Sequence, residues 1–382
     1  MTTDRYRSLD GLRGVAALVV VFHHSLLTLP SIAEYPTVPP LGSLVWWIEV
    51  SPLKIFSAGA EAVLVFFVLS GFVLVLPVLR LRHYDWVSYY FRRSIRLYLP
   101  VVASIALAAV IILLTQRVAF GNGSAWVSAW SIPAPTPGIF AQALDIFETG
   151  NLVNNPLWTL RWEIIFSLAL PLFAYGAMML RRWWLLAIAG VLLVVFVGVL
   201  KNVAVFQYLP VFLAGSLLAV NAERLSLWSE QIRGRRWVSP AWCALLLGGF
   251  ALLIARWMCA SIGAIPYLIP LLTALSFVGA VIVVAVAFLW HPFATVLTIA
   301  PSRWLGRVSF SLYLVHVPII IASANLFGAD HRLLALAVSV PVSLVVAELF
   351  ARFVEAPAHR LSKRVGRGVS ARVAELQAAE AR

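Results

Sequence analysis

Charged residues are scarce in this chain. Asp, Glu, Lys and Arg together make up 12% of its 382 residues, about half of the ~25% that is usual in soluble domains. Hydrophobic residues make up 62%. This composition excludes a disordered chain, a collagen and a soluble multi-domain enzyme, and it indicates a polytopic membrane protein.

Cysteine and recognisable ligand clusters are also scarce. The two cysteines, Cys243 and Cys259, lie in one apolar run, where sixteen helical residues would separate them by ~24 Å, beyond disulfide reach. The seven histidines are scattered without metal-ligand spacing, so no metal site is predicted. No glycine-rich phosphate loop or dinucleotide fingerprint is present, and no bound cofactor is expected.

Long apolar runs dominate what remains. Stretches of about 17–25 mainly apolar residues are typical of membrane-spanning helices. Ten such stretches lie at residues 14–30, 59–79, 97–115, 157–179, 183–200, 203–220, 240–257, 268–290, 308–327 and 333–354. We therefore predict an all-α transmembrane bundle of about ten helices. Residues 1–357 are expected to form the membrane-embedded domain and residues 358–382 a basic cytoplasmic tail.

The basic residues are distributed unevenly between the two sides of this topology. With both termini inside, 23 of the 29 Lys and Arg residues fall on the cytoplasmic side and 6 on the outer side. The positive-inside rule therefore predicts an N-in/C-in orientation. The overall charge of +13 is therefore concentrated at the inner surface. This distribution argues against a nucleic-acid partner and favours contact with membrane lipid and binding of a cytoplasmic polyanion.

Two long outer segments, residues 31–58 and 116–156, are rich in Trp and Pro and poor in charge. Their tryptophans fit interfacial anchoring or a stacking surface for a sugar or another acceptor.

The first apolar run carries an ionisable pair. Arg13 lies at its start and His24 eleven residues later, a rotation within ~20° of three full helical turns. Both side chains should lie on one face, ~16 Å apart along the axis. Arg13 could then hold an anionic group while His24 works near the midplane, a span comparable with a pantetheine arm. The alternative is a hydrogen-bonded packing histidine.

Six short elements, in order along the chain, resemble the motifs of acyltransferase family 3. They are Arg5-Tyr-Arg-Ser-Leu-Asp10-Gly-Leu-Arg13 with His24, Phe66-Phe-Val-Leu-Ser70-Gly71-Phe72, Arg93-Ser-Ile-Arg96, Leu157-Trp158-Thr159-Leu-Arg-Trp-Glu163, Ser311-Leu-Tyr313-Leu-Val-His316-Val-Pro318, and Glu355-Ala-Pro357. One departure is Val63-Leu64-Val65, where many members carry an acidic residue; Glu61 is nearby but out of register.

The resemblance implies an integral-membrane acyltransferase in a bacterial cytoplasmic (inner) membrane. It would move an acyl group, expected to be acetyl, from acyl-CoA to a hydroxyl of a saccharide or related small-molecule acceptor. His24 matches the histidine taken as catalytic in the family. Neither the acceptor nor the oligomeric state can be derived from the sequence.

Physical arguments give the other motif residues provisional roles. Glu163, ~9 Å from the outer end of its predicted helix, would orient His24 or bind the acceptor; otherwise it would pair with Arg161. Arg93 and Arg96, one turn apart, would hold donor phosphates together with Arg13; otherwise they are ordinary positive-inside residues. Five more residues are assigned to substrate binding or structural support: Ser70, Trp158, Tyr313, His316 and Glu355. Glu348, deep in the last run, fits none of these roles.

Two functions therefore remain at this stage. The first is an acyl-CoA-dependent O-acyltransferase with His24 as general base. The second is a proton-coupled transporter or flippase for a lipid-linked or amphipathic solute, in which His24, Glu163 and Glu348 form a proton path. A transporter would be expected to contain inverted repeats, and none is visible in the sequence.

Overall fold

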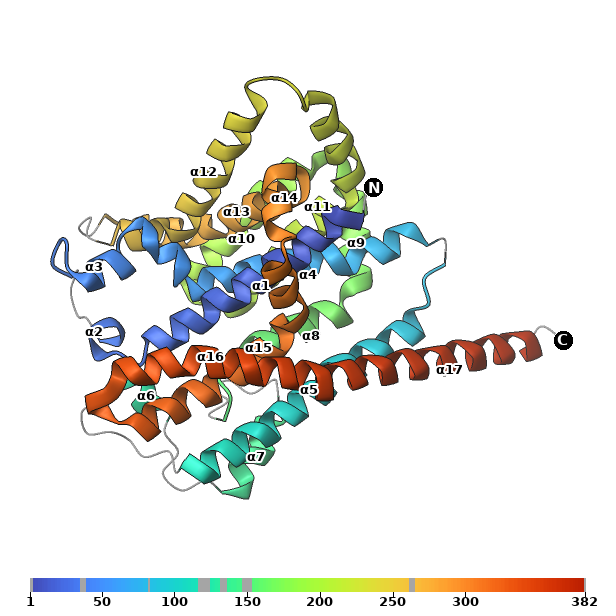
Figure 1. Cartoon of the computed structure of the whole chain (residues 1–382). Coiled ribbons are helices and arrows are strands. Elements are labelled where there is room, and N and C mark those ends of the chain that lie inside the picture. Colours follow the sequence, from blue (N-terminus) through green and yellow to red (C-terminus); the bar gives the residue numbers. More distant parts are fainter. Residues whose placement is uncertain are drawn as a thin grey trace.

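The computed structural model describes residues 3–34, 39–81, 83–115, 124–130, 136–145, 153–260 and 265–380. These residues form helices and connecting turns, with no strand in the described ranges. The long helices pack side by side into one bundle (Figure 1). They are α1 (Thr3–Leu26), α4 (Gly59–Arg80), α5 (Trp86–Thr115), α8 (Leu157–Leu168), α9 (Leu170–Met179), α10 (Trp184–Lys201), α11 (Ala204–Ile232), α12 (Val238–Met258), α13 (Leu268–Leu289), α15 (Ala300–Phe327), α16 (Arg332–Phe350) and α17 (Ala356–Glu380).

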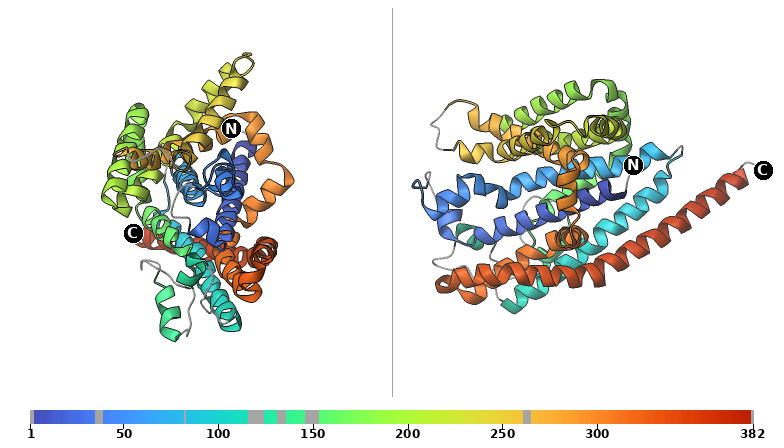
Figure 2. Two further views of the ribbon diagram at one scale, coloured as in Figure 1. Left: turned by 90° about the vertical axis from the view of Figure 1, so that its left-hand side faces the viewer. Right: turned by 45° about the horizontal axis from the view of Figure 1, so that its top comes forward.

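The described helices confirm the predicted all-α transmembrane bundle. Nine of them are long and apolar enough to cross a membrane, and the bent pair α8–α9 makes a tenth crossing if it counts as one span. The 66° bend between α8 and α9 falls at Ala169. Pro171, two residues later, has no backbone N–H to donate to the preceding turn. Both termini lie toward the same end of the bundle (Figure 2), as an even number of crossings requires.

The first helix begins earlier than its apolar run suggests. α1 extends from Thr3 to Leu26, whereas hydrophobicity alone predicts residues 14–30. The added turns belong to the packed bundle: Leu9 is buried, and the buried Ser8 hydroxyl donates 2.8 Å to the carbonyl of Ala287. This shift moves Arg13 to about the middle of the helix and His24 into its last turn.

Glycines bring two pairs of helices into close contact, α1 with α15 and α4 with α11. A Cβ added at Gly14 would lie 2.3 Å from the backbone N of Gly306, so α1 and α15 cross almost backbone to backbone. A Cβ at Gly71 would lie 2.1 Å from the carbonyl oxygen of Phe212, and one at Gly215 would lie 2.0 Å from that of Val68. Small residues that allow such approaches are typical of membrane helix interfaces, and this explains why Gly71 follows Ser70.

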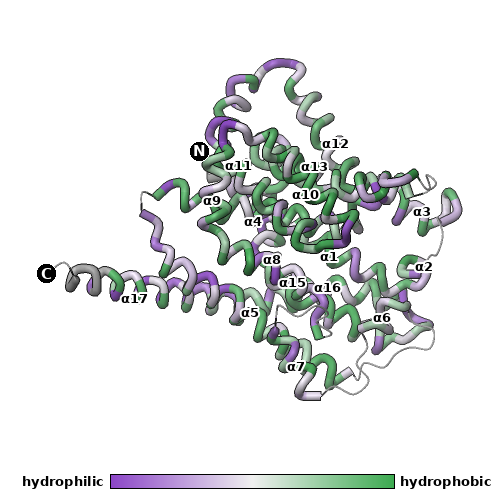
Figure 3. The backbone as a smooth tube through the Cα atoms, turned by 180° about the vertical axis from the view of Figure 1, so that it is seen from behind, coloured by the Kyte–Doolittle hydropathy of each residue, from purple (hydrophilic) through white to green (hydrophobic). Residues whose placement is uncertain are grey.

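Short helices occupy the connections. On the side predicted to be outside are α2 (Pro30–Ala33), α3 (Leu44–Glu49), α6 (Ala125–Ala129), α7 (Pro137–Ala143) and the 3-10 turn η1 (Pro52–Phe56); α14 (His291–Leu297) lies at the other end. The helical core is hydrophobic, whereas the α11–α12 turn and much of α17 are hydrophilic (Figure 3). The segment expected as a basic tail forms helix α17, which runs along the start of α5 and projects beyond the bundle (Figures 1 and 2).

Candidate functional site

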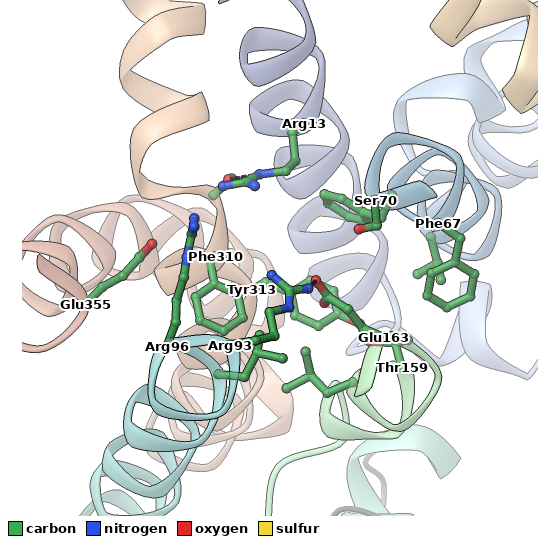
Figure 4. Close-up of a pocket in the computed structure, with 15 residues that line it drawn as sticks. Arg13, Phe67, Ser70, Arg93, Arg96, Thr159, Glu163, Phe310, Tyr313 and Glu355 are labelled. Carbon is green, nitrogen blue, oxygen red and sulfur yellow. Dashed lines mark hydrogen bonds and ion pairs between the residues drawn. The ribbon is translucent and has the colours of Figure 1, made fainter. Parts of the chain in front are cut away.

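A small cavity in the middle of the bundle collects most of the residues singled out from the sequence. Its volume is about 80 Å³, enough for a few waters or a small acyl or phosphate group. Side chains from α1, α4, α5, α8, α15 and the turn before α17 converge on it (Figure 4). Seven of the ten predicted site residues line it: Arg13, Ser70, Arg93, Arg96, Glu163, Tyr313 and Glu355.

The strongest interaction in this central pocket joins α5 to α8. Arg93 Nη2 lies 2.6 Å from Glu163 Oε1, and Arg93 Nε donates 3.0 Å to the Ser167 hydroxyl. Both charged side chains are largely shielded, with exposed fractions of 12% and 23%. Glu163 is therefore the counter-ion of Arg93, which the sequence predicts to bind the donor phosphates. Glu163 does not pair with Arg161.

Glu163 also lies deeper than its predicted helix implies. α8 begins at Leu157, and just before it the Asn154 amide donates 2.8 Å to the carbonyl of Leu314, which lies half-way along α15. The non-helical residues before α8 thus enter the bundle, where Val153 and Asn154 are fully buried. Irregular backbone at membrane depth occurs only where protein covers it. The helix begins at the predicted residue, Leu157, but the length of the apolar run did not predict its depth in the bundle.

The other charged residues of the pocket are Arg13 of α1, Arg96 of α5 and Glu355 at the end of α16's continuation. Arg13 Nε donates 2.9 Å to the Ser309 hydroxyl, and the Ser311 hydroxyl donates 2.6 Å to Glu355 Oε2. Glu355 ends the π-helical turn η4 (Ala351–Glu355), a geometry that is frequent at functional sites. Arg96 forms no ion pair with a described carboxylate. Three arginines against two glutamates leave the pocket one positive charge in excess.

His24 does not line the central pocket. Its ring packs against His316, with His24 Nδ1 3.0 Å from His316 Nε2, and it stacks on Trp126 of α6 at 5.5 Å between ring centroids. Tyr313 connects the two regions, because it lines the pocket and its ring lies 5.9 Å from that of His316. The buried Tyr313 hydroxyl is 2.7 Å from the Thr159 hydroxyl.

Hydrogen bonding orders the protons of the histidine pair. His316 Nδ1 lies 3.0 Å from the carbonyl oxygen of Leu312, which can only accept, so this nitrogen carries the hydrogen. In neutral His316, Nε2 is then an acceptor, and His24 Nδ1 must donate to it. The remaining nitrogen of His24, Nε2, keeps its lone pair free to accept a proton.

Three further residues make their contacts outside the pocket. Trp158 packs on Tyr208 at 5.2 Å between ring centroids. His23 Nδ1 lies 3.0 Å from the carbonyl oxygen of Ser57. Glu61 accepts hydrogen bonds from Arg256 and Trp257; it therefore ties α4 to α12, while Val63 faces the pocket.

Glu348 has a structural explanation. It accepts hydrogen bonds from Trp304 at 2.8 Å and Arg307 at 2.7 Å, and it pairs with Arg352 one turn away. Three donors satisfy this carboxylate within the α15–α16 contact. Arg352 is thereby engaged with Glu348 and forms no ion pair with Glu355.

Sequence reasoning missed several supporting groups. Ser309 and Ser167 position Arg13 and Arg93, and Trp126 covers His24. Each contact joins residues more than 70 positions apart, so no local pattern could have identified the pairs. The Trp-rich composition of the outer segment was the only available signal for Trp126.

Comparisons with known proteins identify the family of the chain. The model of the acyltransferase domain matches residues 6–352. The chain is 28% identical to the acyltransferase MdmB of Streptomyces mycarofaciens, over 94% of this chain and 92% of that protein. It is 25% identical to the O-acetyltransferase PaAT-1 of Phomopsis amygdali, over 86% of this chain and 74% of that protein. No solved structure matches. With its bundle of membrane-spanning helices and a family match over nearly its whole length, the chain belongs to acyltransferase family 3.

Proposed function

We propose that the protein transfers an acyl group from cytoplasmic acyl-CoA to a hydroxyl of a saccharide or related small molecule, with His24 as general base. The observation that carries the proposal is the ordered pair His24–His316, which leaves one imidazole nitrogen as an acceptor. One of the similar proteins is named an O-acetyltransferase, which supports acetyl as the group transferred. Family membership favours this enzyme over a transporter or flippase.

The donor would be held by the central pocket. Arg93 is neutralised by Glu163, whereas Arg13 and Arg96 have no carboxylate ion-pair partner among the described residues, so these two are the candidate phosphate ligands. Arg13 and His24 are eleven residues apart on α1, or ~16 Å along the axis. The pantetheine arm would cover this distance and bring the thioester past Tyr313 to the histidines.

The acceptor would approach from the outer side, where Trp126 offers a ring for stacking. His24 Nε2 takes the hydroxyl proton while the hydroxyl oxygen attacks the thioester carbonyl carbon. The C–O bond forms, the C–S bond breaks, and the departing CoA thiolate recovers the proton from His24. In the alternative order, the acyl group passes first to His24 and then to the acceptor.

The experiment uses inside-out vesicles from a bacterium that expresses the protein, supplied with [14C]acetyl-CoA. We expect label in an extractable glycan or small molecule, with release of free CoA. His24→Ala should lose at least about 100-fold of this transfer, while His331→Ala, an exposed histidine far along the chain, should retain it. Wild-type transfer by His24→Ala would overturn the role of His24. Solute movement without acyl-CoA, and no labelled product, would overturn the enzyme.

The same preparation distinguishes the two chemical orders. Purified protein mixed with acetyl-CoA and no acceptor should release about one CoA per molecule if His24 carries the acyl group. Direct attack predicts no such burst.

A further inference from the structure

A second and much larger cavity lies at the end of the bundle that is predicted to be cytoplasmic. Its volume is about 860 Å³, ten times that of the central pocket and within the range of ~300–1,000 Å³ that is usual for ligand sites. The α11–α12 hairpin, the end of α13, α14 and the first turns of α1 and α15 enclose it. The hairpin stands over α14 and the start of α1 (Figures 1 and 2).

Arginines from three separate parts of the chain converge on this basic cavity. The α11–α12 turn supplies three of them, α1 supplies Arg7 and α15 supplies Arg303. Gly234 allows the turn to reverse tightly, since its φ of +121° is disfavoured for other residues. Four of the arginines form no ion pair with a described carboxylate: Arg233, Arg235, Arg236 and Arg303.

Aromatic and apolar side chains also line the cavity. Trp242 and Phe288 are buried behind it, and Trp290 lies at the corner between α13 and α14. Among the described residues, Glu230 is the one acidic side chain that lines the cavity. A lining that combines aromatic rings with several guanidinium groups suits a ligand that carries both phosphate and a flat or apolar portion.

These arginines are exposed, so water screens their mutual repulsion, and a bound anion would lower it further. Positive-inside retention requires arginines at the membrane surface but no cavity between them. We propose that this basic cavity is a binding site for an amphipathic phosphate-bearing ligand, separate from the central pocket. The ligand chemistry has two possible sources: the nucleotide end of a CoA molecule, and the headgroup of an anionic membrane lipid.

The two cavities lie on different sides of α1 and α15. Arg7 precedes Arg13 by six residues, as Arg303 precedes Ser309, which gives ~9 Å of axial rise and a rotation of ~120° between the members of each pair. Between the members of each pair the two helices touch, since a Cβ added at Gly306 would lie 2.4 Å from the carbonyl oxygen of Asp10. The nucleotide source rests on the proposed acyl-CoA function, whereas the lipid source is independent of it.

The test compares two double variants of the full chain in nanodiscs. Arg235→Gln with Arg236→Gln removes two cavity arginines. The matched control is Arg181→Gln with Arg182→Gln. These two adjacent arginines are exposed in the turn between α9 and α10 and do not line the cavity. The first arm titrates CoA calorimetrically in phosphatidylcholine discs. The second arm measures phosphatidylglycerol retention by native mass spectrometry from mixed discs.

At about fivefold per arginine near a phosphate-bearing surface, the cavity variant should bind one of these probes about thirtyfold more weakly than the wild type. The control should stay within about threefold. Loss confined to CoA assigns the cavity to the nucleotide, and loss confined to phosphatidylglycerol assigns it to lipid. Equal binding by the wild type and the cavity variant in both arms overturns the proposal. Acyl transfer measured in parallel separates the two hypotheses, because a failed transferase with intact cavity binding rejects only the proposed function.

Discussion

His316 provides the sharpest test of the proposed chemistry, because it touches the base but does not line the central pocket. His316→Leu removes the acceptor for His24 Nδ1, which is 3.0 Å away in the native pair. His24 then keeps its ring but loses the bond that fixes its proton on Nδ1. His316 is fully buried, so no water replaces the missing nitrogen directly.

The size of the effect follows from the single bond removed. A neutral intramolecular hydrogen bond contributes about 0.5–1.5 kcal/mol, which corresponds to a loss of about 2- to 10-fold in kcat if the bond serves only to orient His24. Removal of the base itself, in His24→Ala, should cost about 10²- to 10⁴-fold. The KM for acyl-CoA should be unchanged in His316→Leu.

The assay is labelled-acetyl transfer by the wild type, both single variants and the double variant. If His316 acts through His24, the double variant should be no slower than His24→Ala alone. Ser323→Ala is the matched control, because Ser323 is buried on the same helix and bonds only to the carbonyl of its own preceding turn. If the fold losses in kcat of the two single variants multiply in the double variant, His316 does not act through His24. A raised KM with unchanged kcat in His316→Leu would refute the same idea.

Three further predictions concern the frame around the site. Gly71→Ala places a Cβ 2.1 Å from a backbone oxygen of α11 and should lower stability by about 1–3 kcal/mol in thermal unfolding, whereas Gly176→Ala, with open space around it, should not. Glu163→Gln should cost about 1.5–3 kcal/mol in the same assay, and adding Arg93→Gln should recover part of that loss; no recovery would contradict the ion pair. Hydrogen bonds from α17 and from the backbone of α5 hold the pKa of Asp85 below its usual value. The stabilisation they give is therefore present at neutral pH and is lost as the pH falls through that lowered pKa. Asp85→Asn should increase hydrogen exchange in α17 at neutral pH.

Hydrophobicity and motif spacing were sufficient to predict the bundle and most of the pocket. Apolar runs identify the crossings because the membrane core sets their length. Arg93 and Arg96 share a face because three residues nearly complete one turn. The positions of the helix ends could not be predicted in this way, because Thr3–Arg13 are polar yet helical, packed against α13 and α15.

The long-range partners of Glu163 and Glu348 could not be predicted from the sequence either. Glu163 finds Arg93 because the segment before α8 enters the bundle and carries the helix inward. Glu348 finds Trp304 and Arg307 because α15 and α16 pack side by side. In both cases the choice among several arginines depends on helix packing, which no local spacing contains.

The motif residues lie in two regions, the central pocket and the His24–His316 pair, and Tyr313 contacts both. The arginines of the central pocket face the side from which acyl-CoA is proposed to come, and His24 with Trp126 faces the other. Tyr313 lines the first region and touches His316 in the second, and its hydroxyl is held by Thr159. Because residues three apart on a helix are neighbours, the Tyr313–His316 spacing joins the arginine pocket to the base within one turn of α15. In the proposed mechanism, the donor thioester would pass Tyr313 to reach His24, and the two substrates would meet at this turn.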